Sequence, residues 1–261
     1  GGDGLSERVV GEYVRRNGCR EEMVIASKGA HPPVPGYRAV ADYMSPSRLE
    51  SDIDDSLGRM QIETIDLYWL HRDDPRVAVG EILDMLQAEK QRGRIRCFGG
   101  SNWTAERLDE ANRYAAEHGI EGFVASQPRW SLLEYESKSR EERLKPGVLL
   151  HADEDDRSRH AASRLPMICY GPTGNGFFAN EGKAPEKFIS DENTARAARA
   201  KEVAELIGAT PNQVALAWLR AQPFPVVPIL GTADVAHLRD ALGAVDVSLT
   251  EEQVGYLETG G

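Results

Sequence analysis

The sequence predicts an α/β fold in which parallel strands alternate with helices, either a (β/α) barrel or a doubly wound sheet. Short apolar runs alternate with helical runs along the 261 residues. Most of these runs are nearly continuous in apolar residues, as expected when both faces of a parallel sheet are covered. The glycines of "GPTGNG" (171–176) do not have the GxGxxG spacing of a dinucleotide-binding doubly wound sheet. No linker divides the chain, so 1–261 is predicted to form one domain.

Six of the apolar runs are predicted to be strands. If they form a barrel, its chemistry is expected at the carboxyl ends of the strands. In chain order the runs are "MVIASK" (23–28), "TIDLYWLH" (64–71), "IRCFGGS" (95–101), "GFVASQ" (122–127), "MICYG" (167–171) and "VVPILG" (226–231).

The helices between these strands have sequence features that mark their ends. Ser45 and Pro46 form an N-cap and first-turn pair, and Gly93 is expected to stop a helix whose apolar stripe begins at Val79. Two further helix starts match the capping box, in which the side chains of Thr and Gln, three residues apart, accept hydrogen bonds from each other's backbone N–H groups. They are Thr210-Pro211-Asn212-Gln213 and Thr250-Glu251-Glu252-Gln253.

Two acidic stretches are predicted to be solvated loops. "HADEDDRSRH" (151–160) carries two histidines and four carboxylates, and a metal site is the less favoured interpretation. Asp73 and Asp74 directly follow a predicted strand. They are expected to be solvated in the loop and to cap the helix that follows.

Composition and charge exclude several classes of protein. The formal net charge of -11 argues against a general nucleic-acid binder, because phosphate binding needs basic patches. No apolar run approaches the roughly 20 residues of a membrane helix, and no signal peptide opens the chain. Cys19, Cys97 and Cys169 are odd in number and widely spaced. This number and spacing argue against a disulfide framework and against a zinc site, and they suit a protein of the reducing cytoplasm. No metal is predicted.

Polar residues capable of catalysis or binding end the predicted strands. If strands 23–28 and 64–71 are neighbours, Lys28 and His71 project side by side into one barrel mouth. A lysine beside a proton-donating group favours the ionised form of that group and lowers its pKa. A neutral histidine beside it can orient or polarise a carbonyl oxygen. The other strand ends supply Ser101, Asn102, Gln127, Tyr170, Gly231 and Thr232.

In their order and combination, several motifs resemble those of the aldo-keto reductases. The resemblance implies a (β/α)8 barrel of the TIM type that reduces small carbonyl substrates, or oxidises the corresponding alcohols, with a nicotinamide cofactor. NADP(H) is the expected cofactor and NAD(H) the alternative. The motifs include "GDGLSE", which begins at Gly2, "VIASKG", "SLGRMQIETIDLYWLHRDD", "GRIRCFGGSNW", "SQPRWSLL", "YGPTGNGFF" and "VVPILGTADVAHLRDALGA".

The resemblance implies a catalytic tetrad of Asp, Tyr, Lys and His, of which this chain shows two members. Lys28 matches the lysine, which tunes the tyrosine, and His71 matches the histidine near the substrate oxygen. In the family the Asp and the Tyr precede the motif that here begins at Gly2. The first two strand–helix units are therefore expected to be missing, and six of eight barrel strands are recognised. The chain as given would then lack the tyrosine that acts as the general acid in the family.

The resemblance assigns the other strand ends to the cofactor. Ser101, Asn102 and Gln127 match the groups that hold the nicotinamide carboxamide, and Tyr170 matches the aromatic residue that stacks on the nicotinamide ring. The segments that match those around the pyrophosphate, the 2′-phosphate and the adenine contribute Gly171, Thr173, Asn175, Gly231, Thr232, His237 and Asp240.

Two residues depart from the family pattern near the adenosine. Asp234 stands where a basic residue is often found, and a carboxylate there would repel a 2′-phosphate. His237 and Arg239 are the residues that could compensate. Ala241 stands where an asparagine that contacts adenine is common.

Two functions from different classes fit the sequence. The leading one is an NAD(P)H-dependent carbonyl reductase that acts on a small carbonyl or alcohol, with no nucleic-acid or membrane partner. The alternative is a cofactor-binding regulatory subunit, because the same fold serves as the β subunit of potassium channels. An Asp and a Tyr upstream of "GDGLSE" would favour the enzyme. The oligomeric state is not predicted.

Overall fold

In the computed structural model of the chain, residues 4–33, 42–179 and 186–261 are described. The first two residues of the "GDGLSE" motif, Gly2 and Asp3, lie outside them. The chain divides into two units, of which unit 1 comprises Gly1–Ser126 and Ser139–Leu150. Unit 2 comprises Gln127–Lys138 and His151–Gly261.

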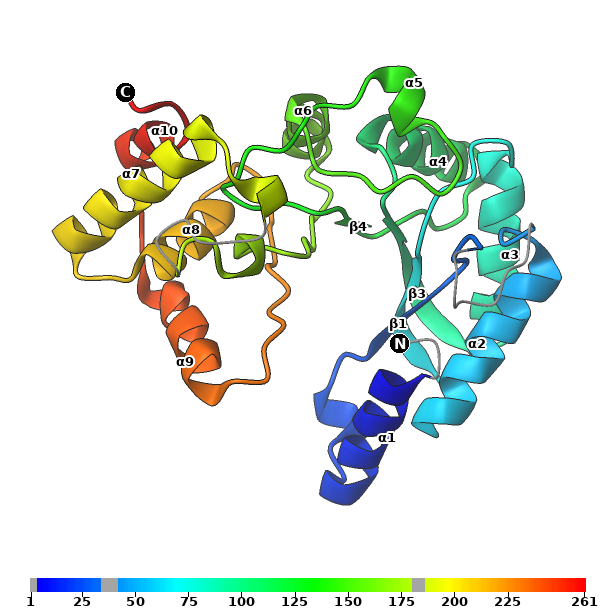
Figure 1. Cartoon of the computed structure of the whole chain (residues 1–261). Helices are drawn as coiled ribbons and strands as arrows, with labels where there is room; N and C mark the ends of the chain where they lie inside the picture. The colour runs from blue at the N-terminus through cyan, green and yellow to red at the C-terminus, as the bar shows by residue number, and fades with distance from the viewer. Residues whose placement is uncertain (1–3, 34–41, 180–185) are drawn as a thin grey trace. The chain divides into compact units, whose positions relative to one another are not determined.

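A parallel sheet forms the centre of unit 1 (Figure 1). Its strand order is β1-β2-β3-β4, and both β1–β2 and β2–β3 pair in parallel. Five of the six residues of β2 are buried, as expected for a strand covered on both faces. The strands are β1 (Ala26–Gly29), β2 (Ile65–Leu70), β3 (Ile95–Ser101) and β4 (Ser126–Gln127), whose last residue begins unit 2 in the chain.

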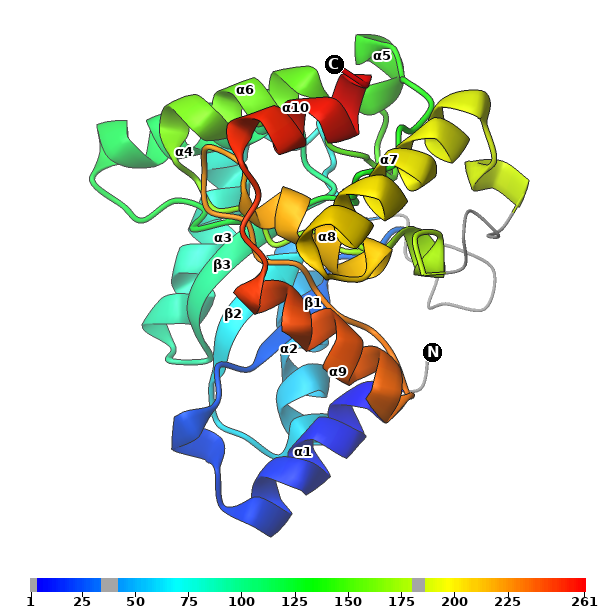
Figure 2. The same ribbon diagram turned by 90° about the vertical axis from the view of Figure 1, so that its left-hand side faces the viewer.

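Helices pack along the sheet of unit 1, as Figures 1 and 2 show. The helix that follows β1 in the chain contacts β1, and the helix that follows β2 contacts β3. This arrangement is that of repeated strand–helix units. The helices of this unit are α1 (Leu5–Asn17), η1 (Arg20–Glu22), α2 (Pro46–Met60), α3 (Val79–Gln91), α4 (Ala105–His118) and α5 (Arg140–Arg143).

The register between β2 and β3 explains why position 99 of the sheet is a glycine. Trp69 pairs with Gly99, and the Trp69 side chain is among the largest fully buried ones. A Cβ atom at Gly99 would lie 2.3 Å from Cζ3 of Trp69. Glycine at position 99 therefore makes room for the indole, which fills the interior beside the sheet.

Unit 2 contains a second set of parallel pairings. Backbone hydrogen bonds of 2.9–3.1 Å join Met167 and Cys169 to the segment 225–229. On the other side, Tyr170 N donates to Pro128 O at 3.1 Å, and Tyr170 O accepts from Trp130 N at 3.2 Å. The predicted runs 167–171 and 226–231 are therefore parallel neighbours, although they form isolated bridges rather than continuous strands.

Several strands are shorter than predicted, for reasons visible in their hydrogen bonds. In the run 23–28, the N–H group of Ile25 donates to Oδ2 of Asp66 at 2.8 Å instead of to a neighbouring backbone carbonyl, and the strand begins only at Ala26. In the run 226–231, Pro228 has no N–H group to donate to a ladder.

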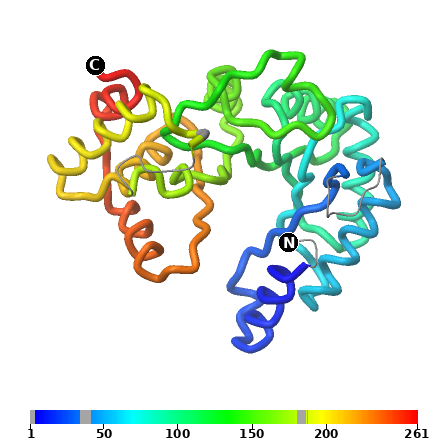
Figure 3. Tube along the Cα trace, in the orientation of Figure 1, coloured from blue at the N-terminus to red at the C-terminus, as the bar shows by residue number. Residues whose placement is uncertain are grey.

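The helices of unit 2 pack on one another around an apolar core. α7 contacts both α8 and α10, and α8 contacts α9. The trace in Figure 3 follows the extended segment 225–231 from α8 into α9. No helix in the described parts of the chain is long and apolar enough to cross a membrane. The helices are α6 (Glu154–Ser163), η2 (Gly174–Gly176), η3 (Glu186–Phe188), α7 (Asp191–Ile207), α8 (Pro211–Arg220), α9 (Val235–Gly243), η4 (Ala244–Asp246) and α10 (Glu251–Thr259).

Most of the predicted helix ends are confirmed. Thr210 and Thr250 head complete capping boxes at α8 and α10. Gly93 follows the C-cap of α3 with φ 75°, a conformation that glycine adopts without strain. Ser45 is the N-cap residue of α2, but its hydroxyl donates to Asp42 O instead of capping the helix.

The prediction of a loop over 151–160 is wrong. Residues Glu154–Ser163 form α6, and the side chains of Asp153 and Asp156 complete a capping box at its start. His160 is buried against Phe224, and its Nδ1 lies 2.8 Å from Leu165 O. The acidic residues therefore stabilise a helix start, where carboxylates interact favourably with the helix dipole.

The predicted roles of Asp73 and Asp74 are also wrong. Both are buried, and α3 has Ala78 as its N-cap, without a side-chain cap. Asp73 forms an ion pair of 3.2 Å with Arg107 of α4, and Asp74 accepts hydrogen bonds from Arg76. Burial raises the pKa of Asp73 to about 7, although Arg107 opposes this effect.

Candidate active site

Lys28 and His71 lie at the carboxyl ends of neighbouring parallel strands in unit 1. Lys28 is the third residue of β1. His71 directly follows β2, and its N–H group donates to Gly29 O at 2.8 Å. This placement was predicted from the sequence, and it depends only on β1 and β2 being adjacent and parallel.

The surroundings of these two side chains disfavour positive charge. Burial lowers the pKa of Lys28 to about 8, with a further contribution from Arg72. Burial also lowers the pKa of His71 to about 3, and the charge of Arg72 adds to this effect. At neutral pH, His71 is therefore a neutral imidazole that can donate a hydrogen bond, whereas Lys28 loses its proton only slightly above neutrality.

Two residues beside His71 were not predicted from the sequence. The rings of His31 and His71 meet edge to face, with centroids 4.5 Å apart. Arg72 is buried, and its Nη1 donates to His71 O at 2.8 Å. Arg72 could have been noticed because it adjoins His71 in the sequence. His31 could not, because its approach depends on how the chain turns after β1.

Ser101 is the last residue of β3 and Asn102 directly follows it, and both are buried. Asn102 adopts φ 55°, a left-handed conformation that asparagine tolerates better than most residues. Its Nδ2 donates to His71 O at 3.2 Å and to Ser101 Oγ at 3.1 Å, and its Oδ1 accepts from Leu150 N at 3.1 Å. Asn102 thus ties the end of β3 to the end of β2. Gln127 ends β4 and is also buried.

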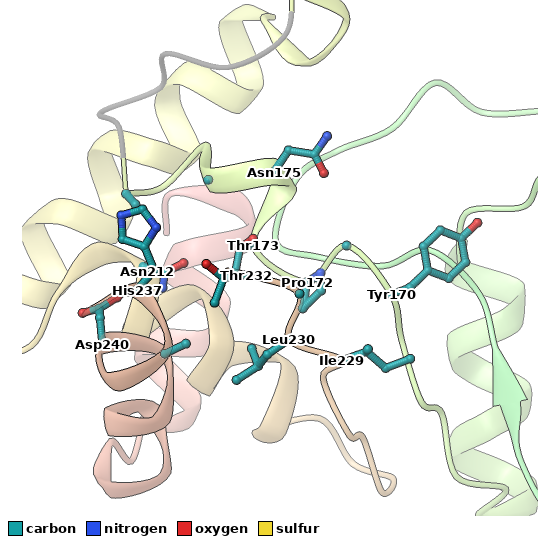
Figure 4. A pocket seen from close by; sticks show the side chains of 15 residues that line it. Tyr170, Pro172, Thr173, Asn175, Asn212, Ile229, Leu230, Thr232, His237 and Asp240 are labelled. Carbon is teal, nitrogen blue, oxygen red and sulfur yellow. Dashed lines mark hydrogen bonds between the residues drawn. The ribbon is translucent and has the colours of Figure 1, made fainter. Parts of the chain in front are cut away.

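In unit 2, the other predicted site residues surround a single cavity of about 620 Å³ (Figure 4). Two segments far apart in the sequence, 170–176 and 229–241, contribute most of its wall, and the start of α8 contributes Asn212. The predicted residues that line it are Tyr170, Gly171, Thr173, Asn175, Gly231, Thr232, His237 and Asp240.

The first of these segments is a tight turn that small residues permit. Gly171 and Asn175 have φ values of 66° and 57°. A Cβ atom at Gly174 would lie 2.5 Å from Cδ1 of Leu133. The turn can therefore pass close to the core and present its backbone to the cavity, as a site for a phosphate-bearing ligand needs.

The ring of Tyr170 is at one end of the cavity (Figure 4). The guanidinium carbon of Arg129 lies 5.5 Å from the centroid of this ring and 5.9 Å from that of Phe188. Arg129 therefore contacts two aromatic rings by cation–π interactions. No role for Arg129 was predicted from the sequence.

The start of α9 borders the cavity on its other side. Asp234 is the N-cap residue, and its Oδ1 accepts from Ala236 N at 2.7 Å and from His237 N at 3.3 Å. These two hydrogen bonds lower the pKa of the Asp234 carboxyl group. A negative charge therefore already occupies the helix N-terminus, beside the cavity residues Thr232 and His237.

Asp240 is held by hydrogen bonds from the start of α8. Thr210 Oγ1 and Asn212 Nδ2 donate to its two carboxylate oxygens, each at 2.8 Å. Gln213 Nε2 donates to its backbone oxygen at 2.9 Å. In the sequence, Asn212 was only part of a capping box, and nothing in the sequence marked it as a cavity residue.

Comparison with known proteins decides the family. Residues 2–259 match the family model described as the Aldo/keto reductase family. The chain belongs to this family. It is 28% identical to the aldo-keto reductase yakc of Schizosaccharomyces pombe, whose name specifies NADP(+), over 97% of this chain and 74% of that protein. It is 29% identical to 6-dehydroglucose reductase of Novosphingobium aromaticivorans, over 94% of this chain and 71% of that protein.

A solved structure shows the same fold. The crystal structure of the thermostable aldo-keto reductase Tm1743, in complex with the inhibitor epalrestat, superposes with a TM-score of 0.72. The match covers 99% of this chain and 78% of that one, at 23% identity. The predicted TIM-type α/β fold is thus confirmed. That its first two strand–helix units are missing stays a prediction.

Family membership confirms the predicted class of activity. This aldo-keto reductase is an NAD(P)H-dependent oxidoreductase of the carbonyl-reducing class. The roles of its individual residues and its choice between the two nicotinamide cofactors do not follow from membership alone.

Proposed function

We propose that this aldo-keto reductase reduces small aldehydes or ketones and holds its nicotinamide dinucleotide in the cavity of unit 2. One observation carries this proposal. Eight of the residues that the resemblance assigned to the cofactor, Tyr170, Gly171, Thr173, Asn175, Gly231, Thr232, His237 and Asp240, come from two segments more than fifty residues apart and line a single cavity. Its volume of about 620 Å³ lies in the range of small-molecule sites.

The residues of the cavity fit such a cofactor chemically. Tyr170 supplies an aromatic face for a flat ring, and the turn 171–176 supplies close backbone for phosphates. At the start of α8, Asn212 Oδ1 is a buried acceptor without a hydrogen-bond partner among the described residues. A buried acceptor is rarely left unpaired, and an N–H group of a ligand would pair it.

In unit 1, we assign Lys28 and His71 to the chemistry. When bound, the reduced nicotinamide supplies the hydride. A neutral His71 orients the substrate carbonyl by donating a hydrogen bond to its oxygen. Lys28 places a positive charge at the same strand ends, where it favours negative charge developing on oxygen. That oxygen takes up its proton from the tyrosine of the tetrad that the resemblance implies, or from water. Because its pKa is lowered to about 8, this charge is lost in mildly alkaline solution.

NADPH is the cofactor we propose. The NADP(+) in the name of the yakc relative supports this choice. Asp234 opposes it, because its charged carboxylate lies at the N-terminus of α9 beside the cavity. The advantage of NADPH over NADH is therefore expected to be smaller than a basic residue at this position would give.

Assays of carbonyl reduction with Lys28→Met test this proposal. The intact protein, with the Asp and Tyr of the tetrad that the resemblance implies, is mixed with NADPH and a panel of small aldehydes and ketones, and the loss of reduced nicotinamide absorbance is followed. Turnover is expected to fall by about 10²–10⁴-fold in Lys28→Met, while cofactor affinity changes little. Loss of cofactor binding in Lys28→Met would make Lys28 a binding residue. Failure of the unaltered chain to bind either cofactor would refute the proposal.

Nothing in the comparisons supports the alternative of a channel regulatory subunit, since the relatives described above are reductases. The three cysteines are free. This finding supports the proposal that the protein works in a reducing compartment such as the cytoplasm.

A further inference from the structure

Arg129 is a half-buried cation in unit 2 that contacts aromatic rings instead of a carboxylate. Its guanidinium carbon lies over the rings of Tyr170 and Phe188, at 5.5 Å and 5.9 Å from their centroids. Within the described parts of the chain, this guanidinium forms no ion pair and donates no hydrogen bond. By contrast, Arg196 of the same unit pairs with Glu192 at 2.8 Å. The described residues therefore leave the positive charge of Arg129 uncompensated.

Backbone pairing holds Arg129 beside Tyr170. The two residues form a parallel bridge. The residues on either side of Arg129 bond to Tyr170, because Tyr170 N donates to Pro128 O at 3.1 Å and Trp130 N donates to Tyr170 O at 3.2 Å. A Cβ atom at Gly171 would lie 3.5 Å from Nε of Arg129, so the side chain runs along the start of the turn. The position of the cation relative to the ring is thus fixed by the fold.

The two faces of the Tyr170 ring have different neighbours. Tyr170 lines the cavity, and Arg129 does not (Figure 4). The guanidinium therefore lies over one face of the ring, outside the cavity, and leaves the other face for a ligand. The proposed function, on which this inference rests, places the nicotinamide ring of the cofactor on that other face.

The nicotinamide ring changes its charge in the reaction. The reduced ring is neutral, and the transfer of its hydride to the carbonyl carbon leaves an oxidised ring with a positive charge. An aromatic face attracts such a cation. A second cation behind the same face opposes this attraction, because the two positive charges are only about 9 Å apart when the rings stack. A neutral ring experiences no such repulsion.

We propose that Arg129 is a specificity-determining residue that weakens the binding of the oxidised cofactor relative to the reduced cofactor, by holding a positive charge behind the ring of Tyr170. Phe188 contacts the same guanidinium and holds it in place without neutralising it. The oxidised cofactor formed by carbonyl reduction then dissociates more readily. The site consequently favours reduction of a carbonyl over oxidation of an alcohol.

The experiment compares the affinities for the oxidised and reduced cofactors. NADPH, NADP(+), NADH and NAD(+) are titrated by protein fluorescence against the full chain, Arg129→Met and Arg129→Lys. Arg129→Met removes the charge and keeps a long side chain, and its affinity for NADP(+) is expected to increase roughly 5- to 20-fold. Its affinity for NADPH is expected to change by no more than about twofold. NAD(+) and NADH should show the same pattern, because both pairs share the nicotinamide ring.

Two further variants test whether the charge is the cause. Arg129→Lys keeps the charge, so its ratio of NADP(+) to NADPH affinity is expected to stay close to that of the unaltered chain. Arg196→Met is the matched control. Arg196 is also half-buried in unit 2, but it donates to Leu132 O and does not line the cavity. Its removal is expected to leave the ratio unchanged. Thermal unfolding checks each variant, and Arg129→Gln replaces Arg129→Met if the latter does not fold.

The outcomes separate this inference from the proposed function. An equal change of both affinities in Arg129→Met would overturn the inference, because Arg129 would then act on a part of the cofactor that both forms share. The same ratio in Arg129→Lys and Arg129→Met would also overturn it, since the charge would have no effect. Both results leave the proposed function standing. Failure of the unaltered chain to bind any of the four cofactors would overturn the proposed function, and this inference with it.

Discussion

His71 is a neutral imidazole whose burial couples protonation to folding. Because the folded protein lowers its pKa to about 3, the unfolded chain binds a proton on this residue between about pH 6.5 and pH 3 and the folded chain does not. The free energy of unfolding is therefore expected to decrease as the pH falls through this window. His71 alone should account for about 2 kcal/mol between pH 7.5 and pH 5.

Urea unfolding of the unaltered chain and of His71→Gln at these two pH values measures this effect. The variant is expected to lose less stability on acidification. The pKa of His31 is also lowered, mainly by burial, so part of the pH dependence should remain. An unchanged pH dependence in His71→Gln would show that the imidazole of His71 is solvated in the folded protein.

Asp234 is the residue on which cofactor choice is expected to depend. Asp234→Ser keeps a side-chain acceptor for the start of α9 and removes the charge, and Asp234→Arg reverses the charge. The affinity for NADPH is expected to increase from Asp through Ser to Arg, with roughly a two- to fivefold gain for the neutral variant. The affinity for NADH should hardly change.

Fluorescence titrations of both cofactors against the three proteins measure these affinities. Equal gains for NADPH and NADH would mean that the 2′-phosphate binds away from the start of α9. A loss of stability in Asp234→Arg is expected in any case, because arginine cannot accept the N–H bonds of Ala236 and His237.

At the scale of elements, two capping boxes of the same type have different consequences. Thr250 caps α10. Thr210 caps α8 and also donates to Asp240 in the cavity wall. Replacing either threonine with alanine is expected to lower the free energy of unfolding by about 0.5–2 kcal/mol. Only Thr210→Ala is expected to weaken cofactor binding as well.

Thermal unfolding and cofactor titration of the two variants separate these effects. Thr250→Ala is the control, because it removes a helix cap but no hydrogen bond to the cavity residue Asp240. Weaker cofactor binding in both variants would indicate that loss of stability, rather than the position of Asp240, controls affinity.

At the scale of the whole molecule, each unit has a helix with an exposed apolar stripe. On α1 the stripe consists of Leu5, Val9 and Tyr13, which are 66%, 60% and 56% exposed. On α9 it consists of Val235, Leu238, Leu242 and, just beyond the helix, Val245. Apolar residues exposed at helical spacing are typical of a face that packs against further polypeptide.

The 261-residue chain is therefore expected to self-associate through these stripes. Val9→Lys and Leu242→Lys should each lower the average mass measured by sedimentation. Leu206→Lys is the control, because Leu206 is 78% exposed on α7 and belongs to neither stripe. A monomeric unaltered chain, or an equal effect of all three substitutions, would show that the stripes do not drive association.

The sequence by itself determined the features that depend on local order. The alternation of apolar runs and helices predicted an α/β fold, either a barrel or a doubly wound sheet, and the family resemblance implied the TIM-type barrel that the comparisons confirm. The spacing of Thr and Gln predicted two capping boxes, because a capping box is complete within four residues. Lys28 and His71 were placed together because adjacent parallel strands have their carboxyl ends on one side.

Tertiary structure alone decided which polar groups are buried and what they bind. Asp73 pairs with Arg107, 34 residues away, instead of lying in solvent. Asn212 meets Asp240, 28 residues away, and becomes part of a cavity wall. Local sequence cannot predict such pairs. The neighbours of a polar residue in the sequence are the same whether its side chain binds a distant residue or is solvated by water. The cost of burying a polar group without a partner then decides which pairs the folded chain keeps.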